Sequence, residues 1–282
     1  MPPWNAPQLK TLSKAAFKAH NITLPVDWEQ PTGDAGKQYV DSFKLTELFA
    51  PPDPAKLFVP ATPNKYHVDT VKKISGQFEA FIDGVCDAIC NAISMWKLQA
   101  KFKDLKVMAV SAIGAPGCLD GPETKPFVLM TAPKASANEN KYSKAVATHF
   151  SEAFKKWQDK VTVPGLPWYP AFAAFPGPQA PPMPNVPTPL IACPSAMMTE
   201  MTPGPLKDGM VKKLDDKKAQ HHEELFDALG KGIAAIFTMW LPQQQVMLVL
   251  GKGPIPTFAP PYVPVGPVLG GDNIAAPGHL MS

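Results

Sequence analysis

The chain has 282 residues, 45% of them hydrophobic, which is enough apolar material to bury a core. All 27 basic residues are lysine, and against 24 acidic residues they give a net charge of +3. Because arginine is the usual residue for reading guanine edges and clamping phosphates, its absence argues against base-specific nucleic-acid recognition. Prolines number 35, or about 12% of the chain against a usual ~5%, so proline-rich segments must belong to the architecture.

The first 50 residues are predicted to form an N-terminal arm. "APQLKTLSKAAFKAH", residues 6–20, has the character of a short helix, and the prolines of "FAPPDPAK" mark a boundary near residue 50. The chain begins without a charged start followed by an apolar run, so no signal peptide is expected. We expect the arm, residues 1–50, to dock elsewhere on the domain or onto a neighbouring chain.

Three tryptophans each close a helical stretch later in the chain. Trp96 ends "FIDGVCDAICNAISMW", Trp157 ends "HFSEAFKKW" and Trp240 ends "LFDALGKGIAAIFTMW". The first and third stretches align without a gap, and the second joins them through Phe150 and Phe154. Such ordered self-similarity indicates an internal repeat. We interpret the three tryptophans as structural anchors that pack each helix onto the strand after it, in preference to ligand-stacking residues.

The sequences around these helices extend the repeat. After the helix, "VMAVSAIGAPG" (107–117) matches "VMLVLGKGPIP" (246–256), and before it lie three apolar stretches predicted as strands: "KLFVPATP" from 56, "KPFVLMTAP" from 125 and "TPLIACPSA" from 188. This pattern predicts an α+β fold of three tandem helix-plus-short-strand units with proline-rich extended segments. A pseudo-threefold arrangement would suit three such units. The predicted limits are residues 51–121, 122–186 and 187–282.

Sequence signatures of catalysis and of cofactor binding are missing. The chain has no G-x-x-x-x-G-K-[ST] loop, no G-x-S-x-G elbow and no H-E-x-x-H pair. The four cysteines are better read as small buried residues than as metal ligands. We therefore predict no enzyme activity, no cofactor and no metal, with an enzyme of unfamiliar site as an alternative. The most apolar stretch, 225–241, is interrupted by Asp227 and Lys231, so no membrane span is predicted.

The stretch "GKGPIPTFAPPYVPVGP", residues 251–267, carries six prolines with apolar residues between them. A disordered tail would be poorer in such residues, so an ordered strap or inter-subunit arm is favoured over a bait for a proline-reading module. The candidate interaction residues are Phe258, Pro260, Pro261, Tyr262 and Val263.

The C-terminal unit, with its Met-Trp helix end, apolar strand and "GKGPIPTFAPPYVPVGPVLGGD", resembles virion structural proteins of tailed phages and of related contractile injection particles. The resemblance covers about the last fifty residues. It implies a non-enzymatic component of a capsid, tail or baseplate, located in the particle after synthesis in the cytoplasm. Its partners would be other structural proteins of the particle or further copies of itself. The alternative is a proline-rich intracellular binding or adaptor protein.

Overall fold

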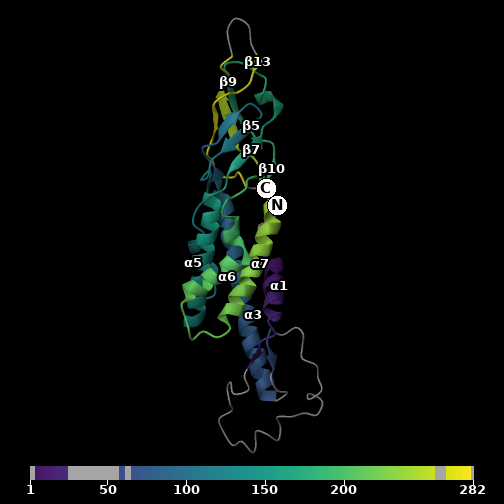
Figure 1. Ribbon diagram of the computed structural model, residues 1–282, viewed down its shortest axis with the longest axis vertical. Coiled ribbons are helices and arrows are strands. Elements are labelled where there is room, and N and C mark those ends of the chain that lie inside the picture. The colour runs from purple at the N-terminus through teal and green to yellow at the C-terminus, as the bar shows by residue number, and fades with distance from the viewer. Residues whose placement is uncertain (1–3, 25–56, 61–64, 258–264, 281–282) are drawn as a thin grey trace, which may run out of the picture.

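The computed structural model describes residues 4–24, 57–60, 65–257 and 265–280. The molecule is elongated, with a helical part and an antiparallel sheet at one end of it, while helix α3 continues beyond the other helices at the opposite end (Figure 1). Helices and strands are thus segregated, and the predicted α+β class is confirmed. The candidate interaction residues Phe258, Pro260, Pro261, Tyr262 and Val263 lie outside the described residues.

Three long helices carry the tryptophans. They are α3 (Lys65–Gln99), α5 (Ala137–Asp159) and α7 (His222–Gln243), and each has its tryptophan in the last turn. The start of α5 is fixed by a capping box, in which Glu139 N–H donates to Ser136 Oγ and Ser136 N–H to the Glu139 carboxylate, both at 3.1 Å. The apolar stripe of each helix faces the core, as its 3.6-residue period predicts.

Three short helices precede the long ones: α1 (Ala6–Lys18), α4 (Lys125–Thr131) and α6 (Pro203–Leu214). Each has a proline in its first turn, where the missing N–H costs nothing and the fixed φ suits a helix. Four residues after each N-cap lies a buried aliphatic side chain, namely Leu9, Val128 and Leu206. The short helices therefore begin in the same way.

The predicted strand at 125–131 is wrong, because this segment is helix α4. A short apolar run does not reveal by periodicity whether it is a strand or a buried helix, and here Pro126 at the helix start decides the matter. The two other predicted strands are extended only in part. Val59–Pro60 (β2) belongs to the first and Thr188–Pro189 (β10) to the second, which continues as a 3-10 helix at Leu190–Ala192.

The six α-helices of the described residues pack in a closed ring. Around it the order is α1, α3, α4, α5, α6 and α7, and α7 packs again on α1. Each short helix contacts the long helix that follows it in the chain and a second long helix: α4 lies on α3, α6 on α5 and α1 on α7. The described part of the predicted N-terminal arm is thus built into the helical part, where α1 closes the ring.

The main sheet has six antiparallel strands in the order β7-β5-β4-β14-β12-β9. Their bounds are Val163–Pro167 (β7), Ser111–Gly114 (β5), Lys106–Met108 (β4), Gly271–Asn273 (β14), Leu250–Pro254 (β12) and Gln179–Pro184 (β9). Both edge strands contain prolines, which cannot donate to a further strand. β14, one of the two central strands, comes from the C-terminal segment and separates β4 from β12.

Four two-stranded pairs complete the described strands. β1 (Thr23–Leu24) is parallel to β2 (Val59–Pro60), and the other three pairs are antiparallel. These are β3 (Lys101–Phe102) with β6 (Leu119–Asp120), β10 (Thr188–Pro189) with β11 (Gln245–Val246), and β13 (Val265–Gly266) with β8 (Phe175–Pro176). β3 and β11 each follow a tryptophan helix directly, so they carry the chain from the helical part into the sheet.

Candidate functional site

The three predicted anchor tryptophans meet in the core. Ring centroids lie 6.4 Å apart for Trp96 and Trp157, 6.4 Å for Trp96 and Trp240, and 6.2 Å for Trp157 and Trp240. At most 5% of any of these residues is exposed, so no ligand can stack on the rings from solvent. Each tryptophan packs mainly against the other two and neighbouring phenylalanines, where the sequence predicted packing onto the following strand. The ends of three helices are thereby fixed at nearly equal distances from one another.

Two glutamines hold the polar edges of this cluster. Trp96 Nε1 donates to Gln158 Oε1 at 2.7 Å, and Trp240 Nε1 donates to Gln244 Oε1 at 3.2 Å. Gln244 Nε2 in turn donates to the carbonyl of Leu280 at 2.6 Å, which ties the end of the described chain to the cluster. A buried indole N–H without a partner would be costly, so these bonds define the ring orientations.

The chain leaves α3 and α7 in the same way. Asp104 and Leu248 both have positive φ, 56° and 59°, which is uncommon for residues other than glycine. Each lies eight positions after its tryptophan, and β4 and β12 both begin ten positions after it. The sequence comparison placed Val107 opposite Val246, whereas the backbone places Phe102 there.

Two asparagines bind these equivalent loops with the same hydrogen bonds. Asn273 Oδ1 accepts from Leu105 N–H at 2.9 Å, and its Nδ2 donates to the Phe102 carbonyl at 2.9 Å. Asn185 Oδ1 accepts from Val249 N–H and its Nδ2 donates to the Val246 carbonyl, both at 3.0 Å. An amide side chain supplies the donor and acceptor that both bonds require. Sequence reasoning missed both asparagines, since neither lies in a recognisable motif.

His279 fixes the C-terminal segment, residues 265–280, to the loop that follows α3. Its Nδ1 accepts from the N–H of Phe102 at 2.8 Å, its ring stacks on that phenylalanine, and its carbonyl accepts from Met247 N–H at 3.0 Å. Burial lowers the pKa of His279 from 6.5 to about 4. The neutral imidazole required for this bond is therefore the stable form at neutral pH. The C-terminal segment thus joins residues that follow α3 to residues that follow α7.

Exposed apolar side chains gather on the β4–β5 hairpin. Met108 and Ile113 are 53% and 50% exposed and belong to the outward face of the sheet, and Val110 at the turn is 42% exposed. We call these three residues the hairpin patch. Outward positions of a solvated antiparallel sheet are normally polar, so such a patch is typical of a contact surface.

The described residues contain no group of three or more His, Cys, Asp or Glu side chains placed to hold a metal ion. Burial raises the pKa of Cys86, Cys90 and Cys193 to about 12 and that of Cys118 to about 11, so the thiols stay protonated. A hollow of about 420 Å³ between α3 and α5 is lined partly by Phe78, Phe81 and Tyr142.

One described helix, α7, is long and apolar enough to cross a bilayer by length and composition, but 67% of its apolar window is buried inside the protein. This is the pattern of a core helix and agrees with the predicted lack of a membrane span.

Comparison with protein-family models, curated proteins and solved structures found no match to this chain.

Proposed function

We propose that the chain is a structural, assembly-forming component of a phage-like particle and has no enzymatic role. The observation that carries the proposal is the buried tryptophan cluster inside a closed ring of helices, because it joins the ends of three long helices from different parts of one chain. The kind of particle is proposed from the resemblance of the C-terminal unit to virion structural proteins. Localisation in the particle, after synthesis in the cytoplasm, belongs to the same proposal.

We further propose that the three parts are repeats around a pseudo-threefold axis through the tryptophan cluster. Three observations support this: the nearly equal distances between the tryptophans, the pairing of a short with a long helix in each part, and the packing of each short helix on the long helix of another part. In this scheme α1 is the short helix of the first repeat. One chain could then occupy a place suited to a homotrimer while presenting three different faces.

The partners we propose are other structural proteins of the particle or copies of this chain, and the hairpin patch is the candidate contact surface. Prolines on both edge strands disfavour strand addition, so contact through side chains on the sheet face is the favoured mode. A test is the double variant Met108→Asp and Ile113→Asp. We expect it to fold normally but to lose self-association by light scattering and to be depleted from purified particles.

The control for that test is Met130→Asp, because Met130 is 61% exposed but lies on helix α4 and not on the sheet. Assembly should be unchanged in this control. If the hairpin variant assembles as well as the control does, the hairpin patch is not the contact surface. Absence of the chain from particles made in its host, measured by mass spectrometry, would refute the structural role itself.

The alternative function, a proline-rich adaptor, needs a milder test than removing the C-terminus. Deletion of residues 254–282 would remove β14 from the centre of the sheet, so any loss of a partner could follow from damage to the fold. Residues 258–264 should instead be replaced by seven glycines and serines. Loss of a captured partner with unchanged unfolding and unchanged self-association would favour the adaptor function.

A further inference from the structure

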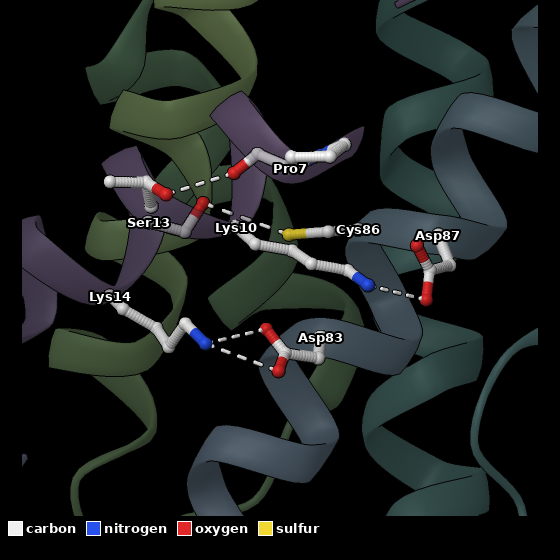
Figure 2. Close-up of polar contacts among 8 residues, drawn as sticks. Pro7, Lys10, Ser13, Lys14, Asp83, Cys86 and Asp87 are labelled. Carbon is white, nitrogen blue, oxygen red and sulfur yellow. Dashed lines mark hydrogen bonds and ion pairs between the residues drawn. The ribbon is translucent and has the colours of Figure 1, made fainter. Parts of the chain in front are cut away.

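Two ion pairs join α1 to α3, with both lysines on α1 and both aspartates on α3. Lys10 Nζ lies 2.8 Å from Asp87 Oδ2, and Lys14 Nζ lies 3.0 Å from Asp83 Oδ1. Figure 2 shows the two lysines of α1 reaching across to the two aspartates of α3, with Ser13 and Cys86 between them. Because both pairs are spaced four residues apart, the contact defines one register of α1 on α3.

α1 also packs closely on α7, and Ser13 contacts both neighbouring helices. Leu9, Ser13 and Phe17 are fully buried, and a Cβ added at Gly232 of α7 would overlap Ser13 Oγ. The end of α1 is held by His20, whose Nε2 lies 3.0 Å from Asp227. α1 therefore occupies a shaped groove between α3 and α7 and recognises it by both charge and shape.

The connection from α1 to its long helix differs from the other two. Residues 132–136 join α4 to α5 and residues 215–221 join α6 to α7, whereas residues 19–64 lie between α1 and α3. A chain of that length can span more than ~100 Å when extended. The short connections restrict α4 and α6 to their own chain. In the first connection β1 pairs with β2, so α1 can leave its own chain only together with β1, and the 32 residues between β1 and the described residue 57 set the reach of that unit.

We propose that α1 is exchanged between copies, so that α1 of one chain occupies the α3–α7 groove of a second chain. The α1 contacts are the same whether α1 comes from the same chain or from a second one. Exchange is therefore favoured when the local concentration of other copies exceeds the effective concentration at which the connection holds α1 near its own groove. Copies packed side by side in an assembly would reach such a high local concentration. The inference rests on the proposed assembly-forming role and names the partner as a second copy of this chain.

The test uses the short distance between Ser13 and Cys86, since Cys86 Sγ donates to Ser13 Oγ at 3.8 Å. A chain carrying Ser13→Cys and Cys86→Ser cannot close this bridge within itself. It is mixed, at concentrations where the protein self-associates, with a wild-type chain bearing a size tag, and both are mildly oxidised. Exchange predicts a covalent heterodimer on a non-reducing gel, which is absent when either chain is oxidised alone.

The single variant Ser13→Cys is the control for folding, because it retains Cys86 and can close the bridge within or between chains. Exchange is overturned if this control forms the bridge but the mixture yields no heterodimer. If the chain assembles without the heterodimer, only the exchange fails. If the chain remains monomeric and is absent from particles, the proposed function fails first.

Charge reversal gives a second, independent measurement. One chain carries Lys10→Glu and Lys14→Glu, and another carries Asp83→Lys and Asp87→Lys, so each alone places like charges across the α1–α3 contact. In an exchanged heterodimer every contact is attractive again. We expect the mixture to form heterodimers preferentially over both homodimers, while the fourfold variant in one chain behaves as wild type. Equal amounts of homodimer and heterodimer would contradict the exchange.

Discussion

A side chain at Gly232 should destabilise the protein, although the residue lies within helix α7. A Cβ at this position would overlap Ser13 Oγ and come within 3.1 Å of Leu9 Cδ1. Ser13 is fully buried between α7 and Cys86 of α3, so it has little room to move away. The substitution Gly232→Ala therefore sets the intrinsic preference of a helix for alanine against the packing of α1.

The two effects differ in size. Alanine in place of glycine favours a helix interior by about 1 kcal/mol. Inserting one carbon into a tightly packed core costs about 1–3 kcal/mol, and this site is tighter than most because two side chains of α1 crowd it. We expect a net loss of about 1–2 kcal/mol in the free energy of unfolding. The loss should be accompanied by faster hydrogen exchange in α1.

Urea denaturation followed by circular dichroism measures the change. Gly204→Ala is the matched control, because Gly204 lies in the first turn of α6 and no described atom is within 4 Å of its added Cβ. That control should be neutral or slightly stabilising. If Gly232→Ala raised stability as the control does, the close contact of α1 with α7 would be refuted.

Three further changes test the loop and cluster contacts. The aspartate in Asn273→Asp cannot donate to the Phe102 carbonyl, so urea denaturation should show a loss of about 1–3 kcal/mol in the free energy of unfolding. An unchanged urea midpoint would contradict the hydrogen bond of Asn273 to Phe102. The pKa of His279 is about 4 when folded and 6.5 otherwise, so the unfolded state binds more protons between these values. The free energy of unfolding should therefore be highest above pH 6.5 and should fall by about 3 kcal/mol as the pH is lowered to 4. In His279→Gln this dependence of the free energy of unfolding on pH should be weaker. Trp96→Phe leaves Gln158 Oε1 without its buried donor, and thermal unfolding should show a loss of about 1–3 kcal/mol; a Tm equal to wild type would argue against this bond.

The sequence was sufficient to predict the long helices and their common ending. Apolar residues spaced three or four apart define a buried helix face, and a bulky tryptophan at the end of that face is most stable inside the core. The segment at 125–131 was predicted as a strand because seven residues are too few to distinguish the two periods. Its proline at the second position, seen also at Pro7, was the signal that would have identified a helix start.

Contacts between distant parts of the chain could not be read from local patterns. Strand β14 is three residues long, and nothing in Gly271–Asn273 indicates that it pairs with both β4 and β12. The bonds of Asn273 and His279 join positions more than 160 residues apart, as their sequence separations of 168 and 177 show. Such partners depend on topology, which a short polar stretch does not encode alone.

The place of β14 also has a consequence for the order in which the protein is made. Because the chain emerges from its N-terminus, β4 and β12 are synthesised before the strand that lies between them. A product that stops before residue 271 would expose both strands along the edges meant for β14, and unpaired edges invite aggregation. Residues 271–280 therefore complete the main sheet, so a product that stops before them leaves β4 and β12 without the strand that joins them.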